Sequence, residues 1–399
     1  MWQEIAVVII GLVVIFHIGK KIYRFLTHST GTSKSCCHGC SECALKDNNR
    51  SKDKKMHKKV YLLAILGILS IVSCKDNKKQ YYEESGTVFH TLYTIKYEAS
   101  QILTDKIDAE LQKFNLSLNP FNPNSIIAKV NNNEPVEVDE WFTEVFNKSM
   151  EVSRNSDGVF DITCAPLVNL WGFGFNKKDS VTPAMIDSLK AFVGYRKVHL
   201  EGKKVVKDDP RLLLNCSAIA KGYSCDVIAR LLEKEGVENY MILIGGEVVV
   251  KGVNQNGVCW RTGINLPEED PEGIKYNYDE IVQLCKKGAI ATSGNYRNFY
   301  IKDGKKYAHT IDPRTGYPAE QSVLSATIVA DDCMTADAYA TAFMAMGLEK
   351  ARQMADSLPE IEYYVIYADE NGKHQIEYSK GMLQYLPKRK TMNVSSDPS

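Results

Sequence analysis

The alternation of apolar and polar residues changes along the chain, and each pattern predicts a different kind of element. Residues 87–97 are rich in β-branched and aromatic side chains, as in a strand, whereas 100–113 place apolar residues on one face of a helix. Further helices are predicted at 140–155, 217–235 and 335–347, and further strands at 239–252, with a turn at Gly245-Gly246, and at 323–330. Because strands and helices do not alternate regularly, the pattern favours the α+β class over a doubly wound sheet.

Two apolar runs precede this mixed region. The first, 5–19, is followed by Lys20, Lys21 and Arg24, so we predict a transmembrane helix within 1–27 whose C-terminal side is cytoplasmic. A buried core helix is the alternative, but such a helix usually keeps a polar face.

The second apolar run, 60–72, has the features of an export signal. It follows a basic stretch, is short for a membrane span, and leads into Ile-Val-Ser-Cys74. That ending resembles a bacterial lipobox, which predicts lipidation of Cys74, with 60–81 as signal and tether and the remainder exported. Met56 offers a second start, so the chain is either a fusion of two proteins or has its start placed too early, and the sequence leaves both open.

Composition excludes one class of function. The 399 residues are 44 % hydrophobic and 25 % charged, as in ordinary globular proteins, and 49 lysines and arginines balance 49 acids. A neutral chain gives no electrostatic basis for binding nucleic acid. The globular part is expected at 82–385, and the polar end, 386–399, is expected to be disordered.

The 11 cysteines are unevenly distributed. Cys36, Cys37, Cys40 and Cys43 lie in a basic linker at 28–59, expected to be cytoplasmic, at a spacing that suits a soft metal or an iron–sulfur cluster; a metal-free, redox-sensitive segment is the alternative. The predicted span and this cluster together resemble the small FeoB-associated cysteine-rich membrane proteins. Beyond Cys74, the remaining cysteines show no ligand spacing, and the sequence does not pair them.

The strongest chemical signal is a pair of oxygen ligands in the predicted helix 335–347. Asp337 and Thr341 are spaced i, i+4, so the helix places both on one face. A carboxylate beside a hydroxyl suits a hard cation such as Mg²⁺, which commonly takes one or two carboxylates plus substrate phosphates. A helix-start acid and a buried hydroxyl are the alternative. With His309 just upstream, the pattern indicates a metal-assisted site for a phosphorylated ligand.

Other residues are candidates for the same site. His309 can titrate near neutral pH and act as a general base, or it can order the ligand by hydrogen bonding. Lys221 can pair with phosphate oxygens or be a solvated lysine at a helix start. Ser293 and Gly294 are predicted to form a turn whose N–H groups meet phosphate.

Four segments, in this order, carry a resemblance to a known family. They are GVFDITCAPLVNLWGFG (158–174), NCSAIAKGYSCD (215–226), ILIGGEVVVKG (242–252) with Trp260 downstream, and the run from SGNY through HTIDPRTGYP to ADAYATAF (293–343). Over roughly residues 82–370 the chain resembles the ApbE-type FAD:protein FMN transferases. The resemblance implies a mixed α/β fold with antiparallel sheets. It also implies Mg²⁺-dependent transfer of FMN from FAD to a threonine hydroxyl of a target protein, with release of AMP.

The resemblance further implies roles for individual residues. The metal would be held by Asp337, Thr341 and a backbone carbonyl, which we place at Ala218 with Ala220 as the alternative. His309, Asp337 and Lys221 would be catalytic. The flavin nucleotide would be bound by Phe89, Trp171, Gly172, Phe173, Lys221, Gly245, Gly246, Glu247, Ser293, Gly294, His309 and Thr310. For Trp171 and Asp161 an architectural role is favoured, and for Gly245-Gly246-Glu247 a plain hairpin turn is the alternative.

The sequence departs from the family pattern at two places. The family's G-x-x-M-G-T reads Gly86-Thr87-Val88-Phe89-His90-Thr91 here, with Phe for Met and His for Gly, which bears on affinity for the adenine side of FAD. Asn215 replaces the aspartate that opens D-L-G-G-I-A-K-G, and the loss of this charge is expected to alter the surroundings of the metal. Ser325-Ala326-Thr327 also resembles the sequence around flavinylated threonines, so self-flavinylation is a minor alternative.

Two other functions would use the same residues. A Mg²⁺-dependent FAD pyrophosphatase would release FMN and AMP, and a flavin-binding lipoprotein would retain FAD without turnover. The expected partners are FAD, a flavin-acceptor protein of a membrane redox complex, and the membrane, with no nucleic acid. The catalytic domain is expected in the periplasm, anchored to the inner membrane by the lipid or the membrane helix. The sequence indicates neither the target protein nor the oligomeric state.

Overall fold

The computed structural model describes residues 16–21, 23–24, 79–173, 181–267, 277–295, 299–302, 305–308, 310–319 and 322–387. The chain forms two compact units, Met1–Asp76 and Asn77–Ser399. In the first unit, the described residues 16–21 and 23–24 are helical, and no helix in the described parts of the chain is long and apolar enough to cross a membrane. The described residues do not include the rest of the predicted span, the cysteine cluster, the predicted export signal or Cys74.

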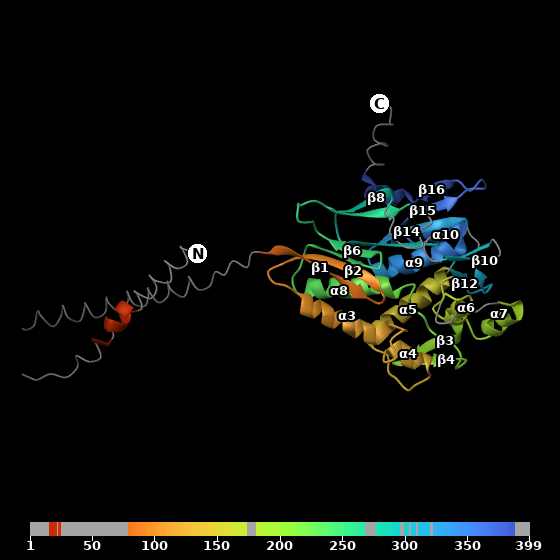
Figure 1. Ribbon diagram of the computed structural model, residues 1–399, viewed down its shortest axis with the longest axis horizontal. Helices are drawn as coiled ribbons and strands as arrows, with labels where there is room; N and C mark the ends of the chain where they lie inside the picture. The colour runs from red at the N-terminus through yellow and green to blue at the C-terminus, as the bar shows by residue number, and fades with distance from the viewer. Residues whose placement is uncertain are drawn as a thin grey trace, which may run out of the picture. The chain divides into compact units, whose positions relative to one another are not determined.

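The second unit is built on an eight-stranded sheet in which every neighbouring pair of strands is antiparallel (Figure 1). In spatial order its strands are β1 (Gln80–Val88), β2 (Thr91–Ala99), β5 (Tyr240–Ile244), β6 (Glu247–Lys251), β9 (Gly288–Gly294), β14 (Val323–Ala330), β15 (Ile361–Ala368) and β16 (His374–Tyr378). Short two-stranded sheets are formed by β3 (Val198–Glu201) with β4 (Lys204–Lys207), β7 (Trp260–Asn265) with β8 (Tyr278–Leu284), β10 (Phe299–Lys302) with β11 (Lys305–Ala308), and β12 (Ile311–Asp312) with β13 (Tyr317–Pro318). The antiparallel arrangement agrees with the α+β prediction.

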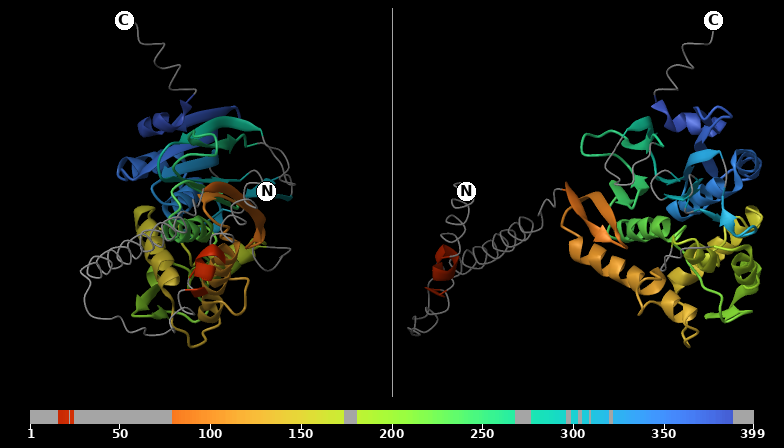
Figure 2. Two further views of the ribbon diagram at one scale, coloured as in Figure 1. Left: turned by 90° about the vertical axis from the view of Figure 1, so that its left-hand side faces the viewer. Right: turned by 45° about the vertical axis from the view of Figure 1, so that its right-hand side comes forward.

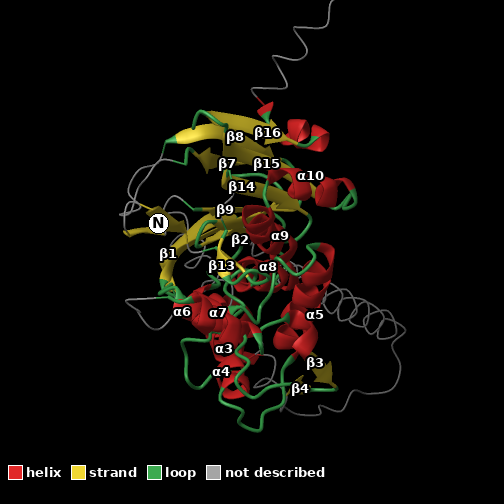
Figure 3. Cartoon of the chain, turned by 90° about the vertical axis from the view of Figure 1, so that its right-hand side faces the viewer, coloured by secondary structure: helices red, strands yellow, loops and turns green. Residues whose placement is uncertain are grey.

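Helices cover one face of the large sheet (Figure 3). The α-helices are α3 (Thr104–Leu118), α4 (Ile126–Asn131), α5 (Glu140–Asn155), α6 (Ala165–Leu170), α7 (Pro183–Lys190), α8 (Ala220–Lys234), α9 (Cys333–Met346) and α10 (Leu348–Asp356); the short 3-10 helices are η1 (Tyr195–Lys197) and η2 (Lys380–Tyr385). Helix α8 packs on β5 and β6, and α9 packs on β9 and β14. Helix α3 lies beside α8 (Figure 2), where Ile107 and Leu111 join Ile228 in one apolar cluster.

Strand β6 explains why the centre of the sheet is buried on both faces. Its valines alternate, so that Val249 points into the cluster under α3 and α8, whereas Val248 and Val250 point into a second cluster with the β7–β8 ribbon. An unbroken run of apolar residues is typical of a strand covered on both sides. The sheet therefore lies between a layer of helices and a layer formed by the β7–β8 ribbon and η2.

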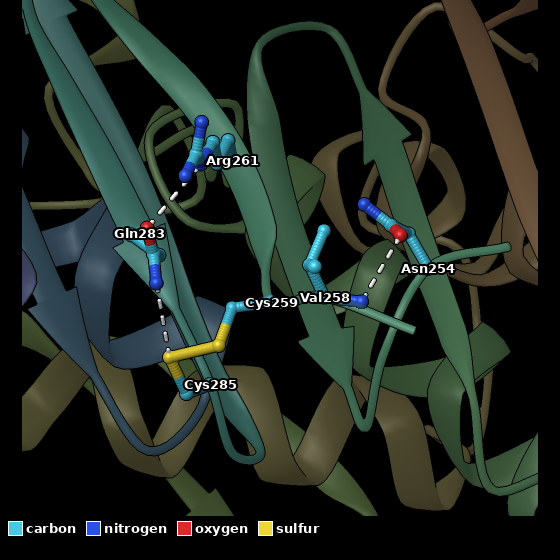
Figure 4. Close-up of a disulfide and its surroundings, with 6 residues drawn as sticks. All are labelled: Asn254, Val258, Cys259, Arg261, Gln283 and Cys285. Carbon is cyan, nitrogen blue, oxygen red and sulfur yellow. Dashed lines mark hydrogen bonds between the residues drawn. A yellow bond between two sulfur atoms is a disulfide. The ribbon is translucent and has the colours of Figure 1, made fainter. Parts of the chain in front are cut away.

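The β7–β8 ribbon carries a disulfide between Cys259 and Cys285 (Figure 4). Gln283 of β8 donates to the sulfur of Cys285 over 3.4 Å and accepts from Arg261 of β7 over 3.2 Å. Four other cysteines of the described chain, Cys164, Cys216, Cys225 and Cys333, are free and buried. The sequence did not pair any of these cysteines.

Several elements match the sequence predictions and one does not. Helix α5 and strand β14 have the predicted bounds, and the predicted strand 239–252 is the hairpin β5–β6 with its turn at Gly245-Gly246. The prediction of one strand at 87–97 is wrong, because the chain reverses at Phe89-His90 between β1 and β2. At the far end, Leu386 is fully buried, so the folded part reaches beyond residue 385; residues 388–399 lie outside the described chain.

Asp226 of α8 holds the start of α9. Its two carboxylate oxygens accept the N–H groups of Cys333 (2.9 Å) and Met334 (2.8 Å), which have no partner within their own helix. Burial raises the pKa of the Asp226 carboxyl to about 7, although these two hydrogen bonds act in the opposite direction. The contact joins the two helices from which the candidate site is built.

Replacing Asp226 by alanine should lower the free energy of unfolding by about 3 kcal/mol, because two buried N–H groups lose their acceptors.

The folded-state pKa of Asp226 lies above the ordinary value of 3.8, so the folded protein binds this proton more tightly than the unfolded chain. Its contribution is complete below about pH 4 and is lost as the pH rises through about 7. Denaturant unfolding between pH 4 and 7 should therefore show a larger loss of stability in the wild type than in Asp226→Ala. The control Asp331→Ala removes an exposed acid nearby and should keep the wild-type slope; parallel curves for all three proteins would contradict the assignment.

Reducing the Cys259–Cys285 disulfide should destabilise the domain by about 3 kcal/mol, because the bridge closes a loop whose ends are 26 residues apart. Thermal unfolding with and without a reductant measures the effect. A Cys259→Ser/Cys285→Ser variant should unfold at the lower temperature in both conditions. An unfolding midpoint of the wild type that does not respond to the reductant would contradict this expectation.

Candidate functional site

A cavity of about 320 Å³ lies between the start of α8 and one face of α9. One wall comes from the segment 159–173 and is apolar, including Phe160 and Phe173, except for Asp161, whose carboxylate accepts the N–H groups of Thr163 and Tyr195. The other wall is polar and contains Lys221, Ser293, Thr310, Asp337 and Thr341. An apolar wall facing a few convergent polar groups is the usual form of a site for a cofactor-sized ligand.

The cavity brings together most of the predicted metal and phosphate residues. Asp337 and Thr341 both belong to α9 and both line the cavity, as their spacing predicted. Ala218 lines it from the segment before α8. Thr310 also lines it, whereas His309 lies outside the described residues.

Ser293 lines the cavity, but not as part of a turn. Ser293 and Gly294 are the last residues of β9 and pair with Ala326 and Ser325 of β14. The predicted phosphate-binding turn at this position is wrong, because the ladder with β14 continues through both residues. Ser293 instead offers its hydroxyl, which lies 3.3 Å from the hydroxyl of Thr341.

Other predicted cofactor-binding residues lie outside the set that lines the cavity. The ring of Phe89 packs on Phe114 in the core, with ring centres 5.1 Å apart. Trp171 is buried and donates its indole N–H to the carbonyl of Gly316 over 2.8 Å, and Gly172 follows it in a positive-φ turn. Trp171 belongs to the apolar cluster against which Phe173 of the cavity wall packs.

The predicted binding residues Gly245, Gly246 and Glu247 do not line the cavity. The two glycines form the β5–β6 turn with φ of 69° and 112°, a backbone conformation that other residues rarely adopt. Glu247 is buried and forms an ion pair with Lys221, which itself reaches the cavity. A Cβ built at Gly245 would lie 3.1 Å from Lys221 and from the second carboxylate oxygen of Glu247, so the glycine leaves room for this pair.

The buried charges of the site do not balance. Burial alone would lower the pKa of the Lys221 ammonium, but the carboxylates of Glu247 and Asp337 outweigh it and raise this pKa. Burial raises the pKa of both the Asp337 and the Glu247 carboxyl, and Lys221 opposes this at each. Two buried carboxylates thus share one ammonium, and one oxygen of Glu247 has no hydrogen-bond partner. A proton on one carboxyl, or an additional cation at the site, restores the balance.

In the segment just before α8, the carbonyl of Ala218 has no backbone partner among the described residues. The N–H of Gly222 donates to Oδ2 of Asp337 over 3.0 Å. In a regular helix the Gly222 N–H would meet that carbonyl. Because Ala218 also lines the cavity and Ala220 does not, Ala218 is the better placement for a carbonyl ligand.

The donor set fits a hard divalent cation. It consists of the free oxygen of Asp337, the hydroxyl of Thr341 and the carbonyl of Ala218, all oxygens, as Mg²⁺ prefers. Within the described residues there is no cluster of three or more His, Cys, Asp or Glu side chains that would hold a softer metal. A cation here would have to complete its coordination with water or with ligand phosphates.

The structure explains one departure from the family pattern, Asn215, and decides one minor alternative, the Ser325-Ala326-Thr327 segment. Asn215 lines the cavity and uses its side-chain oxygen to accept the N–H of Ser217 over 2.8 Å, so it orders the segment before α8 without a charge. The Ser325-Ala326-Thr327 segment lies in β14, where Thr327 is fully buried and its hydroxyl bonds that of Thr292. No acceptor hydroxyl is accessible at Thr327, which removes self-flavinylation at this segment.

Sequence reasoning overlooked some residues of the site. Phe121 lines the cavity, and neither Phe121 nor Gly222 was singled out from the sequence. A Cβ built at Gly222 would lie 2.2 Å from the carbonyl oxygen of Cys333 and 2.8 Å from Cβ of Asp337. A glycine one position after the candidate Lys221 was the only sequence signal of this contact.

Gly222→Ala should force α8 and α9 apart, because the nearest atoms are backbone and cannot rotate away. The expected loss in the free energy of unfolding is about 3 kcal/mol, measured by denaturant unfolding. Gly288→Ala is the matched control, since its Cβ would meet only ordinary contacts, the nearest at 3.7 Å. Equal stability of the two variants would contradict the close helix contact.

Comparisons with known proteins agree with this geometry. Residues 89–365 match the model of the ApbE family. The FAD:protein FMN transferase of Vibrio cholerae serotype O1 is 36 % identical over 308 residues, which cover 74 % of this chain and 90 % of that protein. The protein of the same name from Haemophilus influenzae is 31 % identical over 328 residues, covering 78 % and 93 %. The solved structure of the flavin transferase ApbE from Vibrio cholerae matches with a TM-score of 0.69 and 34 % identity, over 77 % of this chain and 100 % of that chain. Since the family match spans more than half of its length, this chain belongs to the ApbE family.

Proposed function

We propose that this chain transfers the FMN part of FAD to a hydroxyl of another protein and releases AMP. The observation that carries the proposal is the convergence of Asp337, Thr341, Ser293 and Lys221 on one cavity, in a chain of the ApbE family. Curated relatives that align with most of this chain are named FAD:protein FMN transferases. Carboxylate, hydroxyl and ammonium groups are the ones needed to hold a pyrophosphate and its cation.

Mg²⁺ is the proposed cofactor. Asp337, Thr341 and the carbonyl of Ala218 would hold it, for the reasons of charge and free donor atoms given above. When bound, the metal neutralises charge on the pyrophosphate. Lys221, fixed by Glu247, lines the cavity, where its ammonium can pair with phosphate oxygens.

The transfer exchanges one phosphate ester for another. The hydroxyl oxygen of an acceptor threonine forms a bond to the FMN phosphorus, and the bond from that phosphorus to the bridging oxygen breaks. AMP leaves with the bridging oxygen, and the hydroxyl proton passes to a base. We propose His309 for the base, because it directly precedes Thr310, a residue of the cavity wall.

We further propose that the catalytic domain works outside the cytoplasm, lipid-anchored through Cys74, on an acceptor subunit of a membrane redox complex. The export signal at 60–81 motivates the anchor. The Cys259–Cys285 disulfide supports export, since structural disulfides persist mainly in oxidising compartments.

The test is AMP release by the purified full chain supplied with FAD, with and without Mg²⁺, and with and without an acceptor protein carrying a Ser-Gly-Ala-Thr segment. AMP release that requires Mg²⁺ and the acceptor, with covalent flavin on the acceptor, is the expected result. Asp337→Ala should lower the rate at least about 100-fold, because it removes the carboxylate ligand.

Asp356→Ala is the matched control, because it removes an exposed aspartate at the end of α10 and should keep the wild-type rate. AMP release without an acceptor would indicate a pyrophosphatase instead. FAD retained without any AMP would indicate a flavin-binding protein and would refute the transferase.

A further inference from the structure

A second hollow, of about 350 Å³, lies beside the cavity and is lined mainly by basic side chains. Of the acids in the described chain, only Asp157 and Asp161 line it. Its four cations come from the end of α7, from η1 and from the β12–β13 turn. We call it the basic hollow, defined by Lys190, Arg196, Lys197 and Arg314.

The basic hollow shares part of its wall with the cavity, since Asp161 and Pro313 line both. The carboxylate of Asp161 accepts the N–H of Tyr195 over 2.7 Å. The hydroxyl of Thr163 accepts the N–H of Gly194, also over 2.7 Å. These two hydrogen bonds attach the start of η1 to the wall of the cavity, so the fold sets the position of the basic hollow relative to the cavity.

Two of the four cations are already engaged. Arg314 donates to both carboxylate oxygens of Asp312, over 3.0 and 2.9 Å, and lies 3.7 Å from Asp157, whose side chain is 91 % exposed. Lys197 donates to the carbonyl of Lys190 over 3.2 Å, at the end of α7. These contacts fix both cations in the wall, and those of Arg314 offset its charge.

The other two cations, Lys190 and Arg196, form no ion pair with a carboxylate in the described part of the chain. Arg196 instead donates to the hydroxyl of Tyr195 over 3.1 Å, and its guanidinium lies 5.3 Å from the centre of that ring. The ring orients the guanidinium without neutralising it. Positive groups gathered in a hollow attract anions, and a guanidinium suits a carboxylate in particular.

The proposed reaction brings a protein segment to this place. A threonine of the acceptor has to enter the cavity, so the residues on either side of it lie against the surface around the opening. One layer of packed chain is about 10 Å thick, and an extended segment of about five residues spans ~17 Å. Because the two hollows share a wall, side chains within about five positions of the threonine reach the basic hollow.

We infer that the basic hollow binds acidic side chains of the acceptor protein beside the threonine that receives the flavin, and that Lys190 and Arg196 select acceptors by charge. The inference rests on the proposed function, which supplies a protein acceptor. The groups proposed to hold the pyrophosphate, Lys221 and Asp337, line the cavity and not the basic hollow, so the dinucleotide leaves the hollow open. Charge complementarity of this kind mainly sets the choice of partner.

The experiment measures binding of the full chain to an acceptor that cannot react, because its Ser-Gly-Ala-Thr segment carries valine in place of threonine. Titration calorimetry compares an acceptor with aspartates flanking this segment and one with asparagines at the same positions. In Lys190→Gln/Arg196→Gln, binding of the acidic acceptor should weaken about 5- to 20-fold, while binding of the neutral acceptor stays the same. High salt should remove the preference of the wild type for the acidic acceptor, since exposed charges are screened.

Lys203→Gln/Lys350→Gln is the matched control. It removes two exposed lysines, one in the β3–β4 turn and one on α10, that line neither hollow, so both acceptors should bind as they do to the wild type. Reversing the charges in Lys190→Glu/Arg196→Glu should favour an acceptor with lysines at the flanking positions. A damaged fold would bind none of the acceptors, so this exchange of preference separates direct contact from loss of structure.

Equal weakening of the acidic and neutral acceptors in Lys190→Gln/Arg196→Gln, or unchanged binding of both, would overturn the inference. Weaker binding of FAD in this variant would also overturn it, because the hollow would then belong to the dinucleotide site. Loss of binding to vesicles that contain phosphatidylserine, with acceptor binding intact, would assign the hollow to a membrane surface instead. Failure of the proposed function looks different: the wild type prefers the acidic acceptor, yet releases no AMP when the threonine is restored.

Discussion

Helices α8 and α9 meet backbone to backbone at Gly222, and the geometry of the site depends on this contact. No other residue fits there, since a Cβ would overlap the carbonyl of Cys333. The approach brings the Gly222 N–H within 3.0 Å of Asp337, which draws that N–H away from Ala218 and leaves the Ala218 carbonyl available. One helix contact thus positions a carboxylate and frees a carbonyl. Asp226 reinforces the same contact from the other end by holding the first N–H groups of α9.

The sheet supplies the rigid support for this pair of helices. Strands β5, β6, β9 and β14 are neighbours in the sheet and carry α8 and α9 on one face. Two of these strands also deliver polar groups to the site, Glu247 at the start of β6 and Ser293 near the end of β9. Burial on both faces limits how far these strands can shift. The site therefore combines residues that are distant in sequence but held by a single packed layer.

The sequence predicted the parts of this arrangement that depend on local pattern. The i, i+4 spacing of Asp337 and Thr341 located the oxygen pair on α9, and β14 and α5 were predicted with their observed bounds. The β1–β2 reversal was missed because Phe89 and His90 are not turn formers, and only tertiary packing on Phe114 holds them there. Likewise the strand pairing of Ser293 and Gly294 depends on β14, which lies more than thirty residues later. No local signal predicts the long-range contacts of the domain. These include the ion pair of Lys221 with Glu247, the disulfide, and the position of Phe121 in the cavity wall.

The six cysteines of the described domain have a consequence for the order of folding and oxidation. Cys259 and Cys285 are 26 residues apart, whereas the free thiols of Cys216 and Cys225 are only 9 residues apart in the sequence. In an unfolded chain the shorter loop closes at the lower entropic cost, so early oxidation favours the wrong pair. Once α8 packs, Cys225 within it and Cys216 just before it are buried, which removes both thiols from competition; burial also raises the pKa of both thiols, which slows their chemistry further. In an oxidising compartment, correct maturation therefore requires α8 to pack before the disulfide forms, or an isomerase to repair chains oxidised too soon.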